Sequence, residues 1–167
     1  MDYQLRPATS DDLPEIISIY NSTIASRQVT ADITPITLAD RHGWLESHQQ
    51  QGHPVYAIFK AETLIGWFSF SPFYGRPAYR HTCEISIYLA PQARGQGLGK
   101  WILPRTEQIA RQQGIKVLLG FIFSHNIPSI KLFEHNEYQR WGELPQIAEL
   151  DEQRYSLSIL GKHLDAV

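Results

Sequence analysis

The stretch from Thr82 to Lys100, Thr-Cys-Glu-Ile-Ser-Ile-Tyr-Leu-Ala-Pro-Gln-Ala-Arg-Gly-Gln-Gly-Leu-Gly-Lys, combines two patterns. Up to Leu89 apolar and polar residues alternate, which is the period of a strand with one buried face. The second half is rich in glycine, and after it apolar residues recur at helical spacing. The segment therefore predicts a strand, a tight turn and a helix.

The glycines of this turn predict a site for an anion. Gly95, Gly97 and Gly99 permit unusual backbone torsions, and the first turn of the next helix offers unpaired N–H groups with a partial positive charge. The sequence here has neither the dinucleotide fingerprint Gly-x-Gly-x-x-Gly nor the P-loop ending Gly-Lys-Ser/Thr. Glycine spacing alone leaves an ordinary strand-to-helix turn as the alternative.

Length and composition bound the class of protein. The 167 residues fit a single domain over 1–167, and we find no linker or internal repeat. A net charge of −2 gives no electrostatic basis for binding nucleic acid or an anionic membrane. The one cysteine, Cys83, excludes an intrachain disulfide and favours a packing role on the apolar face of its strand. We find no signal peptide or membrane span, so we expect a cytoplasmic protein.

The periodicity along the chain predicts an α/β (α+β) fold. We expect a mixed sheet of six to seven strands with helices on both faces. The expected strands are 2–7, 55–60, 64–71, 82–89, 116–123 and 154–160, and the expected helices begin near residues 9, 37, 98 and 126.

Two motifs carry a family resemblance. Arg94-x-x-Gly97-x-Gly99, directly after a strand with Glu84, resembles the pyrophosphate loop of the GNAT superfamily of acyl-CoA-dependent N-acetyltransferases. The stretch His125–Phe133 resembles the helix start that follows strand five in that superfamily. A closer resemblance is to the phosphinothricin and methionine sulfoximine N-acetyltransferase branch, through Ile19-Tyr20-Asn21, Tyr79-Arg80-His81-Thr82, Glu84-x-Ser-x-Tyr88 and Asn126-Ile-Pro-Ser129.

This resemblance covers nearly the whole chain. It implies the GNAT fold, acetyl-CoA as co-substrate and no metal. It also implies that the acceptor is the free amine of a small amino-acid-like compound such as phosphinothricin, methionine sulfoximine or methionine sulfone. It also implies direct transfer and a homodimer.

Glu84 is the expected catalytic residue. Acyl transfer needs a neutral amine, whereas an amine of pKa about 8 to 10 is mostly protonated at neutral pH, so a base is useful. In the branch that the chain resembles, this glutamate removes the proton directly or through water. The alternatives are a structural pairing with Arg80 or His81, or simple solvation.

The resemblance also assigns residues to the cofactor. The pyrophosphate is expected on the backbone amides of the glycine loop, and Asn126 with Ser129 is expected to hold the pantetheine arm or a nearby phosphate. A backbone N–H between Ile85 and Leu89 is expected to stabilise the oxyanion. The full set expected to bind cofactor is Ile87, Tyr88, Leu89, Arg94, Gly95, Gln96, Gly97, Leu98, Gly99, Lys100, Asn126 and Ser129.

For the acceptor, the loop 72–80 is the main candidate because it carries three aromatic residues and two arginines. Arg76 and Arg80 could bind a carboxylate. Phe73, Tyr79 and Thr82 could line the pocket, although loop packing or a subunit contact would also explain the aromatic residues. Residues 26–32 are expected to close over the acceptor.

One departure from the superfamily concerns the leaving group. Where many members place a tyrosine that protonates the CoA thiolate, this chain has Phe133. Either CoA leaves as a thiolate, or water or Tyr138 supplies the proton.

Two other functions stay open: acetylation of a protein or peptide amine, and a sensor module that binds acyl-CoA without turnover.

Overall fold

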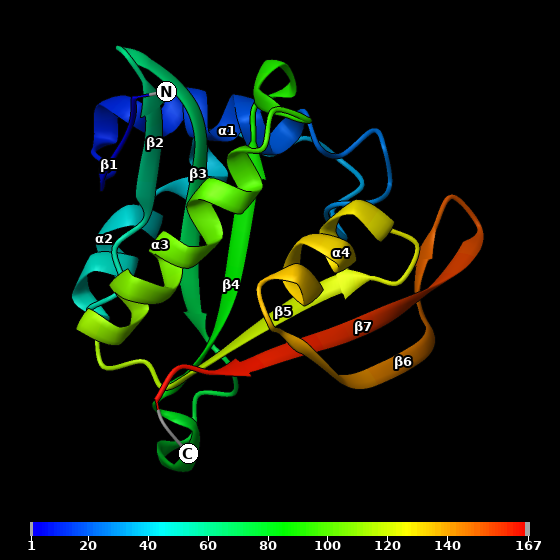
Figure 1. The fold of residues 1–167 in the computed structure, drawn as a ribbon. Coiled ribbons are helices and arrows are strands. Elements are labelled where there is room, and N and C mark those ends of the chain that lie inside the picture. The colour runs from blue at the N-terminus through cyan, green and yellow to red at the C-terminus, as the bar shows by residue number, and fades with distance from the viewer. Residues whose placement is uncertain (1, 166–167) are drawn as a thin grey trace.

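A seven-stranded sheet in the order β1-β2-β3-β4-β5-β7-β6 organises the computed structural model, which describes residues 2–165 (Figure 1). Only β4 and β5 are parallel, and every other neighbouring pair is antiparallel. The elements are β1 (Tyr3–Pro7), α1 (Leu13–Asn21), α2 (Trp44–Gln50), β2 (Tyr56–Lys60), β3 (Thr63–Pro72), β4 (Thr82–Leu89), α3 (Leu98–Gln112), β5 (Val117–Phe123), α4 (Ile127–His135), β6 (Gln139–Leu150) and β7 (Gln153–His163).

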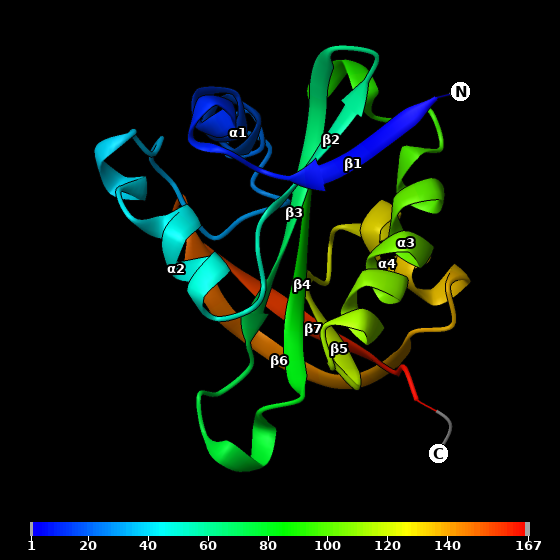
Figure 2. The ribbon, with the colours of Figure 1, turned by 90° about the vertical axis from the view of Figure 1, so that its left-hand side faces the viewer.

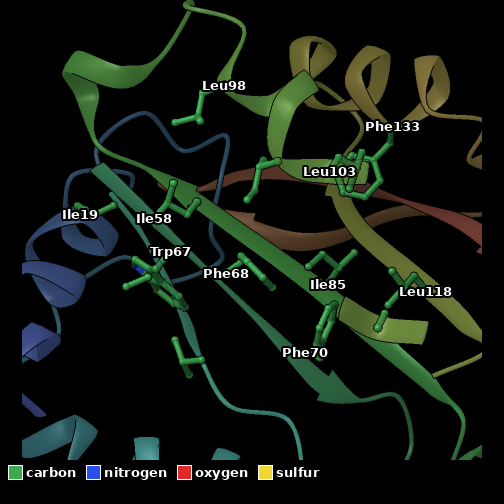
Figure 3. Close-up of a cluster of buried hydrophobic side chains, with 14 of the residues drawn as sticks. Ile19, Ile58, Trp67, Phe68, Phe70, Ile85, Leu98, Leu103, Leu118 and Phe133 are labelled. Atoms are coloured by element: carbon green, nitrogen blue, oxygen red, sulfur yellow. The ribbon is translucent and has the colours of Figure 1, made fainter. Parts of the chain in front are cut away.

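Helices cover both faces of the sheet, which confirms the predicted fold class. Figure 2 shows α1 and α2 on one side of the strands, with α3 and α4 on the other. On the first side, the indole N–H of Trp67 donates to the carbonyl of Ile16 at 3.0 Å. On the second, α3 places Leu98 and Leu103 over the buried Phe68, Phe70 and Ile85 of β3 and β4 (Figure 3).

Two elements differ from the prediction. The strand β6 was not expected, because Gly142 and Pro145 interrupt its pattern and register shifts interrupt its pairing with β7. The helix expected to begin near residue 37 is divided into a 3₁₀ turn at Ala39–Arg41 and the short α2. Gly43, with a φ of 72°, separates the two parts, because this left-handed conformation cannot continue a helix.

In the described residues 2–165, no helix is long and apolar enough to cross a membrane.

Candidate active site

The parallel strands β4 and β5 pair only at one end, where Thr82–Glu84 lies against Val117–Leu119. Beyond this point the two strands diverge (Figure 1). A cavity of about 1180 Å³ opens there, with walls from both strands, the glycine loop, α3, α4 and residues 26–32. Pockets for one small ligand usually span about 300–1,000 Å³, so this volume suits two substrates that meet.

The pairing of β4 with β3 decides which backbone groups face this gap. The N–H of Ala90 donates to the carbonyl of Ile65 at 2.8 Å, and the register along β4 is regular, so its even-numbered residues bond to β3. In an antiparallel pair, the alternate residues direct their N–H and C=O groups away from the partner. Ile85, Ile87 and Leu89 therefore present backbone donors and acceptors to the gap.

Glu84 lies in the cavity wall at the end where β4 and β5 are still paired. Burial raises the pKa of its carboxyl group, because a charged carboxylate loses solvation there. Among the described residues, Glu84 forms no ion pair. The two suggested structural partners are engaged elsewhere: Arg80 donates to the carbonyl of Pro77, and His81 donates to that of Gly114.

The glycine loop is shaped for close approach of a ligand. Gly95 and Gly97 have φ of 71° and 79°, and Gly97 is the N-cap of α3. The Arg94 guanidinium donates to the carbonyl of Leu89 at 3.0 Å and to the hydroxyl of Ser22 at 2.9 Å, which fixes the loop to β4 and to the end of α1. The unpaired N–H groups at the start of α3 therefore lie beside the cavity.

We expect Gly97→Ala to weaken acetyl-CoA binding about tenfold. The left-handed conformation costs a residue with a side chain about 1–2 kcal/mol, and the loop can relieve this strain only by moving its amides. Calorimetric titration with acetyl-CoA measures the change. Gly52→Ala is the matched control, because Gly52 has a φ of 78°, equally open surroundings and no place in the cavity wall. Equal cofactor affinity in the two variants would contradict the prediction.

Asn126 lies in the wall opposite β4 and is buried. Both ends of its side-chain amide are used within the protein. The oxygen accepts the N–H of Ser129 at 3.3 Å and so caps α4, while the nitrogen donates to the carbonyl of Gln28 at 3.2 Å. Asn126 thus ties the first turn of α4 to the segment 26–32.

We call residues 26–32 the strap. All of its members except Arg27 line the cavity, and their closure over the acceptor stays a prediction. The imidazole Nε2 of His125 donates to the carbonyl of Arg27 at 2.9 Å, and the Arg27 side chain forms a two-point ion pair with Asp151 at 2.7 and 3.2 Å. The strap is therefore fixed to the β5–α4 connection and to the turn between β6 and β7.

The structure brings most of the expected site residues to the cavity and leaves others outside it. Those in the wall are Glu84, Ile87, Tyr88, Leu89, Arg94, Gly95, Gly97, Gly99, Lys100, Asn126 and Ser129. Those outside the wall are Gln96, Leu98, Phe73, Arg76, Tyr79, Arg80 and Thr82. Leu98 is instead a core residue, and Gln96 bonds to the carbonyl of Gln92.

The loop 72–80 contacts the cavity wall through Phe73. The ring of Phe73 stacks on that of Phe121, a wall residue, with 6.3 Å between centroids. Phe73 also packs with Tyr74 and Tyr79 in an exposed aromatic cluster. Neither of the two arginines of the loop lines the cavity in this chain.

Several wall residues were not expected to belong to a site. Tyr20 was named only in a motif that carries the resemblance, and nothing local in the sequence indicates that Phe121, Ile147 or Leu157 would line a cavity. Ile147 comes from β6, the strand that the sequence did not predict.

Phe133 lies in the cavity wall, whereas Tyr138 does not. The Tyr138 hydroxyl is buried without a hydrogen-bond partner among the described residues. Burial, with Glu107 nearby, raises the pKa of Tyr138 far above its usual range. The Tyr138 hydroxyl therefore lies outside the cavity in which a thiolate would leave.

A divergent strand pair, an open strand edge and a glycine loop at a helix start together match one family. The chain belongs to the acetyltransferase (GNAT) domain family, whose sequence profile matches residues 3–139. It is an N-acetyltransferase, as the sequence predicted.

The relatives specify this class further. The chain is 48% identical over 161 residues to a Bacillus subtilis protein provisionally named a phosphinothricin acetyltransferase, covering 96% of this chain and 98% of the relative. It is 31% identical over 166 residues to the L-methionine sulfoximine/L-methionine sulfone acetyltransferase of Pseudomonas paraeruginosa, covering 99% and 96%. A crystal structure of a Sinorhizobium meliloti phosphinothricin acetyltransferase in complex with acetyl-CoA superposes with a TM-score of 0.91 at 26% identity, covering 98% of this chain and 89% of that one.

Proposed function

We propose that this enzyme transfers the acetyl group of acetyl-CoA directly to the free amine of a small amino-acid-like acceptor of the phosphinothricin, methionine sulfoximine or methionine sulfone type. The observation that carries the proposal is that one cavity joins the glycine loop to the half-buried Glu84. The names of the relatives support the acceptor class, and the acetyl-CoA complex of the Sinorhizobium meliloti enzyme supports the co-substrate.

Glu84 acts as the general base in this proposal. Glu84 first takes one proton from the ammonium group, the neutral nitrogen attacks the thioester carbonyl carbon, the nitrogen loses its second proton to water, and the carbon–sulfur bond breaks. The raised pKa of Glu84 suits the role, because a carboxylate with a raised pKa is a stronger base. The proton can pass directly or through one water.

The gap between β4 and β5 supports the assignment of the cofactor arm. The backbone groups of Ile85, Ile87 and Leu89 face this gap, so they can bond to the amides of a pantetheine chain as a neighbouring strand would. A backbone N–H of Ile85 or Ile87 can also stabilise the oxyanion of the tetrahedral intermediate. The pyrophosphate binds the amides between Arg94 and Lys100.

Coenzyme A leaves as a thiolate or takes its proton from water. Phe133 in the cavity wall has no proton to donate, and the Tyr138 hydroxyl lies outside the wall. A thiol of pKa about 8.5 is a tolerable leaving group without an acid.

The test of this function is release of CoA from acetyl-CoA across a panel of amines: phosphinothricin, methionine sulfoximine, methionine sulfone, ordinary amino acids, polyamines and N-terminal peptides. We expect saturable turnover with the amino-acid analogues. Turnover with peptides alone would replace the acceptor class. Binding of acetyl-CoA without turnover of any amine would favour a sensor.

The pH profile gives a separate prediction. Below the raised pKa of Glu84 its carboxyl group is protonated and cannot accept the amine proton. We therefore expect kcat/KM to fall as pH is lowered through a pKa above the usual range of a glutamate, which is about 4.3. The measurement is kcat/KM between pH 4 and pH 9. A limb at the ordinary carboxyl pKa would contradict the burial-based assignment.

The proposed roles of Arg76 and Arg80 stay predictions, and so does the homodimer. Phe73, Tyr74 and Tyr79 are 38%, 62% and 44% exposed, which suits a surface that a second copy covers. Sedimentation equilibrium tests whether the protein is a homodimer. The acceptor KM of Arg76→Ala and of Arg80→Ala tests whether these arginines bind the acceptor.

The cytoplasmic location is likewise a proposal.

A further inference from the structure

The side of the cavity that faces α1 carries acidic groups. Asp32 of the strap and Glu84 of β4 both line it, together with the hydroxyl groups of Tyr20 and Tyr88. The basic side chains in the wall come from the glycine loop, α3 and α4, and are Arg94, Lys100, Lys131 and His135. The function proposed above uses Glu84 but gives no role to Asp32.

A closed ring of hydrogen bonds holds the Asp32 carboxylate in place. The Tyr20 hydroxyl donates to Oδ2 of Asp32, and the Thr30 hydroxyl lies 2.7 Å from the same Tyr20 oxygen. The backbone N–H of Asp32 in turn donates to the Thr30 oxygen at 3.2 Å. Burial and the bond to Asp32 raise the pKa of Tyr20 to about 12, so its hydroxyl keeps the proton that it donates. Thr30 must therefore donate to Tyr20, which completes the ring.

This arrangement leaves one carboxylate oxygen open. Oδ1 of Asp32 accepts no hydrogen bond from residues 2–165, and Asp32 forms no ion pair with any of them. Arg41 lies near Tyr20, the partner of Asp32. Its guanidinium stacks on the rings of Tyr20 and Trp44 at 5.5 and 4.9 Å, and Arg41 does not line the cavity. An oriented, exposed carboxylate in a cavity wall can bind a cation.

The amine acceptor of an acetyltransferase arrives as such a cation, because at neutral pH most of it is protonated. We propose that Asp32 is a specificity-determining residue that binds the ammonium group of the incoming acceptor at the strap. This inference rests on the proposed function and adds a recognition step before proton removal. Asp32 is exposed and engages the charged amine, whereas Glu84 is more buried and accepts the proton.

The experiment compares two ligands that differ only in the amine. L-methionine sulfone and its des-amino counterpart, 4-(methylsulfonyl)butanoic acid, are titrated into CoA-loaded enzyme, so binding is measured without turnover. Asp32→Asn keeps the shape of the side chain and an oxygen for the Tyr20 hydroxyl. We expect this variant to bind the amine about tenfold more weakly and the des-amino compound as the wild type does. In turnover, the acceptor KM should rise about tenfold with kcat within about twofold.

Asp40→Asn is the matched control, because Asp40 lies on the same connection between α1 and α2, carries the same charge and is absent from the cavity wall. It should leave both affinities unchanged. Equal weakening of both ligands by Asp32→Asn would overturn the inference, because it would mean that Asp32 only supports the strap. Unchanged binding of the amine would overturn it as well. Failure of the proposed function is distinct, since the wild type would then release no CoA with the amino-acid analogues.

Discussion

Replacement of Glu84 by glutamine should lower kcat by about 10² to 10⁴-fold, the usual contribution of a positioned general base. Glutamine fills the same space beside the cavity but cannot accept the amine proton. The residual rate should then rise about tenfold per pH unit until the free amine supplies its own neutral form. The limb that Glu84 sets in the wild-type profile should be absent from this variant, and only the slope set by the amine should remain.

The measurement is steady-state CoA release from pH 6 to pH 10, with acetyl-CoA affinity measured separately by calorimetry. Cofactor affinity should stay within about twofold, because the expected cofactor contacts lie elsewhere in the cavity. Glu62→Gln is the control, since Glu62 is an exposed glutamate at the turn between β2 and β3. A Glu84→Gln enzyme that keeps the wild-type rate at unchanged cofactor affinity would contradict the assignment of Glu84 as the general base.

The second large effect concerns stability. Lys162 of β7 donates to both carboxylate oxygens of Glu107 on α3, at 3.1 and 3.0 Å, and to the carbonyl of Asn136 at 2.9 Å. The Glu107 side chain is only 7% exposed. Lys162→Met leaves this carboxylate with Arg111, at 3.8 Å, as its remaining ion-pair partner among the described residues. We expect a loss of about 3 kcal/mol in the free energy of unfolding, because breaking a buried pair on one side leaves an uncompensated charge.

Urea unfolding at constant m-value measures this loss, which corresponds to a fall in Tm of roughly 6–12 °C for a chain of this size. The double variant Glu107→Gln/Lys162→Met should recover part of the stability, because it removes the stranded charge. A Lys162→Met protein within about 0.5 kcal/mol of the wild type would show that Arg111 or solvent compensates the carboxylate.

Local patterns predicted the strand of Glu84 and the glycine turn, because alternation and backbone freedom are properties of neighbouring residues. The sheet with helices on both faces followed from the order of such segments. The tie between Asn126 and the strap did not, because the Asn126 amide bonds to Gln28, 98 positions away in the sequence. Arg76 and Arg80 were expected near Glu84 because an amino-acid-like acceptor carries a carboxylate, whereas neither residue lines the cavity in this chain.

The strand β6 is another feature that local sequence patterns did not predict. Its glycine, its proline and its exposed surface hide the strand period, and only the pairing with β7 reveals it. Because Ile147 of this strand lines the cavity, a site prediction without β6 lacks one wall.

The divergence of β4 and β5 has a consequence for self-association. An unpaired strand edge usually invites another chain to add a strand, and proteins protect such edges at the rim of a sheet. Here the unpaired edge lies in the interior of the sheet, between α4 and the strap. The strap, α4 and β5 line this space, so another chain cannot approach the edge as freely as it could at the rim of the sheet. The enzyme can therefore keep an open backbone edge for its substrate with little risk of aggregation through that edge.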